Sequence, residues 1–449
     1  MTAAVLAANR FGLGPRPGEL AAIGSDPRGW LKAQLDPASS VPAVIAALPG
    51  TEARLAALPP AMGASAEAQK QLIQAVLKNA RDQVPQDTTA RLQAAIRSET
   101  PLIERLVAFW ANHFTVSGLR PVAAGLIGPY EAEAIRPHLF GRFVDLLKAA
   151  TLHPAMLLYL DNATSIGPNS RAGERRGKGL NENLARELME LHTLGVDGGY
   201  TQGDVTELAK ILTGWTIHRP GQPQRAIAAE RGGAVFIPAI HEPGEKTLLG
   251  KRYRDQDQDE ADAALDALAR HPATARFIAT KLARHFIADA PPADAVATLA
   301  ETFARTEGDL SAVYARLIDL DAAWQGAGKY RAPYDWVVAI FRAFAADDPD
   351  RARRAVQAVN QLGQRLYFAP SPAGWPDDAD SWLAPESLLA RIDYAEAVGR
   401  TKGETDPLRL ADDTLGETLT PESKQAIQRA PSRSDAVALL LVSPEFLRR

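Results

Sequence analysis

The sequence predicts an all-α protein, one large multi-helix body over residues 1–449 with a small inserted β-hairpin. Apolar residues make up 46% of the chain and aromatic residues only 6%, so alanine and leucine must fill most of the interior. That composition favours closely packed helices over sheets. A clear single helix is expected after Thr100-Pro101, where Leu102, Leu106 and Phe109 recur at helical spacing on one stripe.

Three segments depart from a plain helical pattern. Residues 65–97 are rich in Ala, Gln and Leu with one proline, and they predict a peripheral helical hairpin. Residues 163–180 are rich in Gly, Ser, Asn and Arg, and a connection of this length is typical of a mobile loop or lid. Residues 234–253 carry β-branched runs on both sides of His-Glu-Pro-Gly, which predicts a β-hairpin.

Composition excludes several classes of function. The chain has no cysteine, so disulfides, thiolate catalysis and cysteine-based metal sites are ruled out. Its net charge of −4 gives no sign of general binding to nucleic acids or membranes. The first 20 residues do not have the pattern of a signal peptide, and no run of 18 apolar residues occurs, so the sequence by itself predicts a cytoplasmic protein.

The best candidate for a functional centre is the helix pair between Asn181 and Thr216. Gly195 stands where a left-handed helix end belongs, and Thr201 with Asp204 forms a variant of the capping box at the start of the second helix. On the helical wheel of the first helix, Leu184, Leu188 and Leu191 define the buried side.

Asn183, Glu187 and Glu190 lie on a different side of that wheel, within about 60° of one another. A solvated helix face is the ordinary interpretation of such a stripe. The functional interpretation is a carboxylate and carboxamide site for a divalent metal of unknown identity, with Asp161, Glu187 and Glu190 as ligands. Asn162, Asn183 and Arg186 would then position a polar substrate.

The basic, glycine-rich loop before the first helix could supply anion contacts. Arg175 and Lys178 lead toward a helix N-terminus, where backbone N–H groups favour an anion. The loop lacks the spacing of a phosphate-binding P-loop, so a solvated basic loop and a lid over the site are both open interpretations.

The histidines carry competing interpretations. His113 lies in an apolar stripe and is either a buried histidine with a backbone partner or a ligand or general base. His192 lies opposite Asn183 on the wheel, in the last turn, where an imidazole also stabilises a helix end. His241 at the expected hairpin tip and Trp215 after the second helix are further candidates. No constellation is evident for His138, His153, His218, His271 and His285.

Several long motifs resemble one family across nearly the whole chain. They include FWANHFTVS at 109–117, HPAMLLYLDN at 153–162, HEPGEKTLLG at 241–250 and PAGWPDDADSW at 372–382, together with the helix pair. They closely resemble the bacterial family catalogued as domain of unknown function 1800. That resemblance implies a helical protein and a partner of the domain of unknown function 1501 type, which is similar to alkaline phosphatases and sulfatases. It also leaves open export to the periplasm together with that partner.

Two functional hypotheses follow. In the first, the chain is a metal-assisted enzyme, most simply a hydrolase, in which Glu187, Glu190 and His113 act as acid and base under the basic loop. In the second, it is a non-catalytic helical scaffold or maturation partner of the phosphatase-like or sulfatase-like neighbour.

Overall fold

Helices dominate the protein, as predicted. The computed structural model describes residues 3–36, 40–59, 66–176, 179–218, 227–326, 328–345 and 350–449. Most of these residues are helical, and strands make up only a small part. Within the same residues, no helix is both long enough and apolar enough to cross a membrane.

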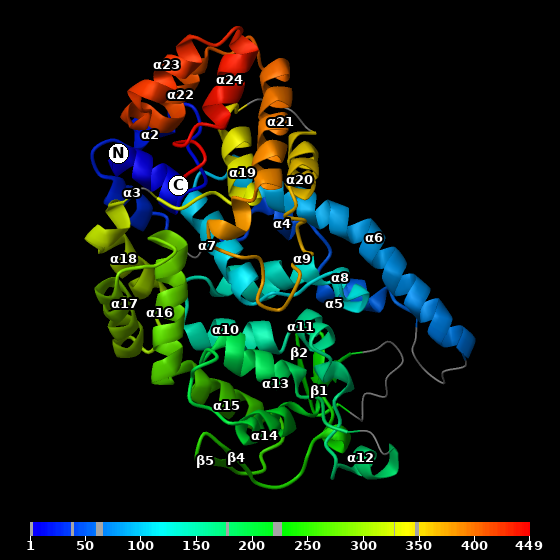
Figure 1. The fold of residues 1–449 in the computed structure, drawn as a ribbon. Helices are drawn as coiled ribbons and strands as arrows, with labels where there is room; N and C mark the ends of the chain where they lie inside the picture. The colour runs from blue at the N-terminus through cyan, green and yellow to red at the C-terminus, as the bar shows by residue number, and fades with distance from the viewer. Residues whose placement is uncertain are drawn as a thin grey trace.

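The helices fall into three consecutive sets (Figure 1). The first set is α1 (Ala3–Leu6), α2 (Glu19–Ile23), α3 (Pro27–Lys32), α4 (Ala43–Ala46), α5 (Thr51–Ala56), α6 (Ala66–Arg97) and α7 (Pro101–His113). The second is α8 (Pro121–Ala124), α9 (Ile127–Tyr130), α10 (Phe143–Thr151), α11 (Pro154–Tyr159), α12 (Arg171–Arg176), α13 (Asn183–Glu187), α14 (Gln202–Leu212), α15 (Asp259–Ala269), α16 (Pro272–Phe286), α17 (Ala293–Arg305) and α18 (Leu310–Asp319). The third is α19 (Pro333–Ala343), α20 (Arg351–Gln361), α21 (Pro385–Thr401), α22 (Pro407–Leu415), α23 (Pro421–Gln428) and α24 (Arg433–Leu441).

Two large apolar cores lie within this assembly. One joins α7 to α10, α11 and α13–α18, and the other joins α19–α24 to the buried C-terminal end of α6. Figure 1 shows the third set of helices at one end of the molecule and α13–α15 with the strands at the other, with α7 between them. Buried arginines join the third set to the N-terminal part of the chain: Arg342 donates to the carbonyls of Gly14 and Ser98, and Arg331 donates to Asn9.

The single hairpin expected over residues 234–253 is replaced by two small sheets. β1 (Trp215–Ile217), β3 (Ala234–Phe236) and β2 (Ala229–Arg231) form an antiparallel sheet in that order, in which Trp215 and Ala229 both pair with Phe236. Among the described residues, β4 (Lys246–Leu248) pairs with β5 (Lys251–Tyr253) alone. The His-Glu-Pro-Gly segment therefore connects two sheets rather than turning one hairpin.

Residues 66–97 form the single helix α6 and not the expected helical hairpin. Pro85 was the reason to expect a break, because proline removes a helical hydrogen bond at a cost of about 3 kcal/mol. The helix continues because its second half is anchored in the protein: Leu92 is buried and Asp87 forms a double hydrogen bond with Arg54.

The described part of the expected lid, residues 163–176, is packed and not open. Gly167 donates its backbone N–H to the carbonyl of Ile240, and Asn169 makes two hydrogen bonds to Glu242. Residues 171–176 form α12. The glycines allow this close packing, because a Cβ on Gly167 would lie 2.5 Å from the backbone nitrogen of Glu242.

Candidate functional site

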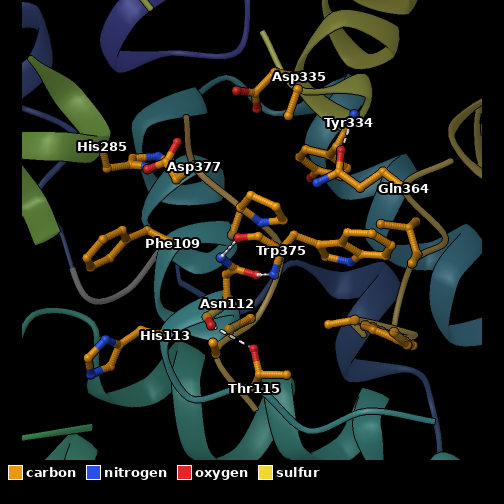
Figure 2. A pocket seen from close by; sticks show the side chains of 18 of the residues that line it. Phe109, Asn112, His113, Thr115, His285, Tyr334, Asp335, Gln364, Trp375 and Asp377 are labelled. Atoms are coloured by element: carbon orange, nitrogen blue, oxygen red, sulfur yellow. Dashed lines mark hydrogen bonds and ion pairs between the residues drawn. The ribbon is translucent and has the colours of Figure 1, made fainter. Parts of the chain in front are cut away.

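A cavity of about 420 Å³ opens where the two apolar cores meet. Its walls come from the end of α7, from α16, from the start of α19 and from the segment 364–378 (Figure 2). A volume of this size suits a small molecule, and boundaries between packed units are common places for ligand sites.

One wall is held by a reciprocal clamp between α7 and the segment around Trp375. The side chain of Asn112 donates to the carbonyl of Trp375 and accepts the backbone N–H of the same residue, at 2.9 and 2.8 Å. Gly374 makes this approach possible, because its φ is +84° and a Cβ there would lie 2.6 Å from the carbonyl oxygen of Asn112. The motifs FWANHFTVS and PAGWPDDADSW thus meet at the cavity (Figure 2).

His285 and Asp377 form a hydrogen-bonded pair in the same cavity. Nδ1 of His285 lies 2.7 Å from Oδ2 of Asp377, and Nε2 is buried with no hydrogen-bond partner in the described protein. Burial lowers the pKa of His285 to about 4, although Asp377 opposes the shift. The imidazole is therefore neutral at pH 7, donates from Nδ1 to the carboxylate, and keeps a lone pair on Nε2.

Cations surround the acidic groups of the cavity. Burial raises the pKa of Asp377, but His285, Arg449 and Lys329 more than reverse this and hold it well below its usual range. Asp335 behaves similarly: Arg105 and Arg449 lower its pKa to about 2 against the effect of burial. Both carboxylates are thus ionised and held in place by ion pairs.

His113 lines the cavity and contacts His192 behind it. Nε2 of His113 lies 3.1 Å from the carbonyl oxygen of His192, which can only accept, so His113 carries its proton on Nε2. This leaves Nδ1 of His113 and both ring nitrogens of His192 buried without a partner in the described protein. Burial lowers the pKa of His192 to about 3 and that of His113 well below its usual value. His192 therefore does not cap the helix end through its ring.

The predicted carboxylate stripe lies on α13 and on the π-helical turn η6 (Leu188–His192). Burial and the neighbouring Glu190 raise the pKa of Glu187, whereas Glu190 lies 3.8 Å from Arg186. Asp161 forms an ion pair with Arg120, and Asn183 reaches it at 3.5 Å. Asp161, Glu187 and Glu190 do not form a metal-ligand group within 4.8 Å among the described residues.

The other predicted substrate-binding residues have separate structural roles. Asn162 is buried and donates to the carbonyls of Leu212 and Trp215, and Trp215 is itself buried in β1. Arg186 pairs with Glu182. Arg175 is exposed on α12, and Lys178 lies outside the described residues.

The group of three potential ligands that the described residues do bring together is His241, Asp255 and Glu260. Nδ1 of His241 donates to the carbonyl of Thr213, so Nε2 faces the Lys246 ammonium at 3.3 Å. That ammonium also lies 2.9 Å from Glu260. Lys246 therefore supplies the positive charge at this position, and a metal ion would have to displace it.

The cavity residues His285, Asp377, Lys281 and Asn112 were not among the predicted site residues. Asn112 and Asp377 belong to two of the motifs that carry the family resemblance, and membership of these motifs is the sequence feature that points to them as site residues. The sequence gives no comparable signal for His285, because its partner Asp377 lies 92 residues away along the chain.

Comparison with known proteins gives a family but no characterised relative. The family described as "Protein of unknown function (DUF1800)" matches residues 6–448. No curated protein and no solved structure matches the chain. Because the match covers nearly the full length, the chain belongs to the DUF1800 family.

Proposed function

We propose that the protein is an enzyme whose reaction takes place in the cavity around His285, most simply a hydrolase. The observation that carries this proposal is the buried lone pair on Nε2 of His285, with Asp377 holding Nδ1. A histidine oriented by a carboxylate is the usual arrangement of a general base. Nε2 would accept a proton from water or from a substrate hydroxyl, while Asp377 would stabilise the imidazolium that forms.

A second candidate centre is the carboxylate pair Glu187 and Glu190. The raised pKa of Glu187 favours it, because perturbed carboxyl groups are frequent at functional sites. A divalent metal held there with Asp161 stays a prediction. It requires Asp161 to exchange its ion pair with Arg120 for the metal.

Chromogenic phosphate, sulfate and carboxylic esters test the two centres together. The variants are His285→Gln, Asp377→Asn and Glu187→Gln, with His218→Gln as control at a half-exposed histidine, each assayed with chelator and with added Mg²⁺, Mn²⁺ or Zn²⁺. We expect His285→Gln to lose turnover by about 10²-fold or more. Two results together would favour the second centre. Only Glu187→Gln would lose activity, and added metal would restore the activity of wild-type protein treated with chelator.

If no ester is turned over under any condition, the non-catalytic hypothesis gains support. A partner of the phosphatase-like or sulfatase-like type is part of that hypothesis. Co-expression of the chain with a neighbouring protein of the domain of unknown function 1501 type, followed by co-purification, tests it directly.

A further inference from the structure

Two cations on α16 face the cavity without an acidic partner. Lys281 and Arg284 are three residues apart and both line the cavity. Neither side chain takes part in an ion pair or hydrogen bond with any other described residue, and the Lys281 ammonium lies 5.8 Å from the ring centroid of Phe277. Arg284 is exposed at the rim, whereas Lys281 is partly buried.

Five carboxylates of the described chain line the cavity. Asp378 accepts the backbone N–H of Ser381. The other four each have a close cationic partner among the described residues. The pairs are Asp377 with Lys329 at 3.2 Å, Asp335 with Arg449 at 3.0 Å, Asp289 with Lys329 at 2.9 Å and Glu131 with Arg91 at 3.1 Å. Lys281 and Arg284 therefore face the cavity without an ion pair to any of these four carboxylates.

The inner wall offers groups of the opposite kind. Nδ1 of His113 and Nε2 of His285 are buried lone pairs without a partner in the described protein, and His113 is only 2% exposed. A buried acceptor left without a hydrogen bond costs about 1–3 kcal/mol, so a ligand that donates a proton to it would be favoured. The cations of α16 are thus suited to an oxyanion, and the neighbouring buried lone pairs to a hydroxyl group or water.

We propose that the substrate of this cavity is a small molecule with an oxyanion group, which Lys281 and Arg284 bind. This rests on the proposed function for the position of the reaction, because the cations place the anionic end of the substrate beside His285, which is four residues after Lys281 on α16. The carboxylate, sulfate or phosphate group would accept charge-assisted hydrogen bonds from both side chains.

The protonation of the neighbouring groups is consistent with this role. Burial, and to a lesser extent Arg284, lowers the pKa of Lys281 to about 8 in spite of Asp377. An anion beside Lys281 would raise that pKa and would also raise the pKa of His285. Binding would thereby bring the proposed general base closer to the pH at which it must accept a proton.

Binding of sodium sulfate to the full chain, measured by isothermal titration calorimetry at pH 7 and low ionic strength, tests the proposal. The variants are Lys281→Gln and Arg284→Gln, and Arg276→Gln is the matched control, because Arg276 is exposed on the same helix outside the cavity. We expect one sulfate per chain in the wild type and the control. Each cavity variant should bind at least about tenfold more weakly.

Two further measurements separate the possible outcomes. Lys281→Gln should unfold at the same temperature as the wild type or higher, because an unpaired cation is removed. If Lys281→Gln does not fold, the sulfate affinity of Arg284→Gln decides the test. His285→Gln should keep sulfate binding, so loss of turnover without loss of binding separates the base from the anion site. Equal sulfate affinity in the wild type and both cavity variants, or no sulfate binding to the wild type, overturns the proposal even if His285 proves to be catalytic.

Discussion

Lowering the pH from 7 to 5 should destabilise the folded protein through its buried histidines. Burial lowers the pKa of His192 to about 3 and that of His285 to about 4, whereas an imidazole in an unfolded chain has a pKa of about 6.5. Between these values the unfolded chain binds protons that the folded chain does not. Stability is therefore full above the unfolded pKa and is lost as the pH falls through and below about 6.5.

The size of the effect follows from the same values. At pH 5, protonation stabilises an unfolded imidazole of pKa 6.5 by about 2 kcal/mol, while the two buried rings stay neutral. Together they should lower the free energy of unfolding by about 4 kcal/mol, compared with a typical total of about 5–15 kcal/mol. His113 shifts in the same direction and adds to the loss.

Urea unfolding of the full chain at pH 7, 6 and 5 measures this dependence. Replacing one ring by a neutral side chain, as in His192→Leu, should reduce the decrease between pH 7 and 5 by about 2 kcal/mol. His218→Gln should retain the wild-type decrease, because its ring is half exposed. The reasoning is refuted if the wild type is equally stable at pH 5 and 7, or if His192→Leu keeps the whole decrease.

Three other substitutions test the packing around the site by urea unfolding at pH 7. Arg136→Met leaves the buried carboxylate of Glu104 without its double hydrogen bond and should lower the free energy of unfolding by about 3–5 kcal/mol. A second change, Glu104→Leu, should restore most of this stability. If it restores none, the buried pair is not the cause of the loss. Gly374→Ala should cost more than about 1 kcal/mol, because the residue has a positive φ and its Cβ would press on Asn112; an unchanged stability contradicts the clamp. Thr201→Ala should cost about 1 kcal/mol through loss of the capping box at α14, and a smaller cost would show that the box is not a main determinant of this helix.

The features predicted correctly from the sequence are those that neighbouring residues determine. α7 begins at Pro101, and its stripe of apolar residues is buried. Gly195 is left-handed, and Thr201 with Asp204 forms the predicted capping box. Each of these depends on groups within a few residues, so the local pattern contains the necessary information.

The cavity could not be predicted in the same way, because its groups come from distant parts of the chain. His285 and Asp377 meet only after α16 and the segment 364–378 have packed against α7. A histidine on a helix and an aspartate in a Pro-Gly-rich segment have no spacing that links them. The expected strand pairing was wrong for a related reason. β3 pairs with β2 and with β1, which precedes it by more than fifteen residues, and not with the run that follows it over residues 246–253.

The helix of the predicted site shows how one backbone irregularity redirects side chains. A regular wheel places Leu191 on the buried side and His192 opposite Asn183. In the structure His192 is fully buried and Leu191 is partly exposed. The turn from Leu188 to His192 is π-helical, and a π-turn holds one more residue than an α-turn, so later positions are shifted by about one residue. The shift brings the ring of His192 to the ring of His113, with centroids 6.0 Å apart, and so joins the helix pair to the wall of the cavity. The outer carboxylate stripe of the same helix has no such contact, because Glu187 precedes the π-turn and Glu190 lies against Arg186.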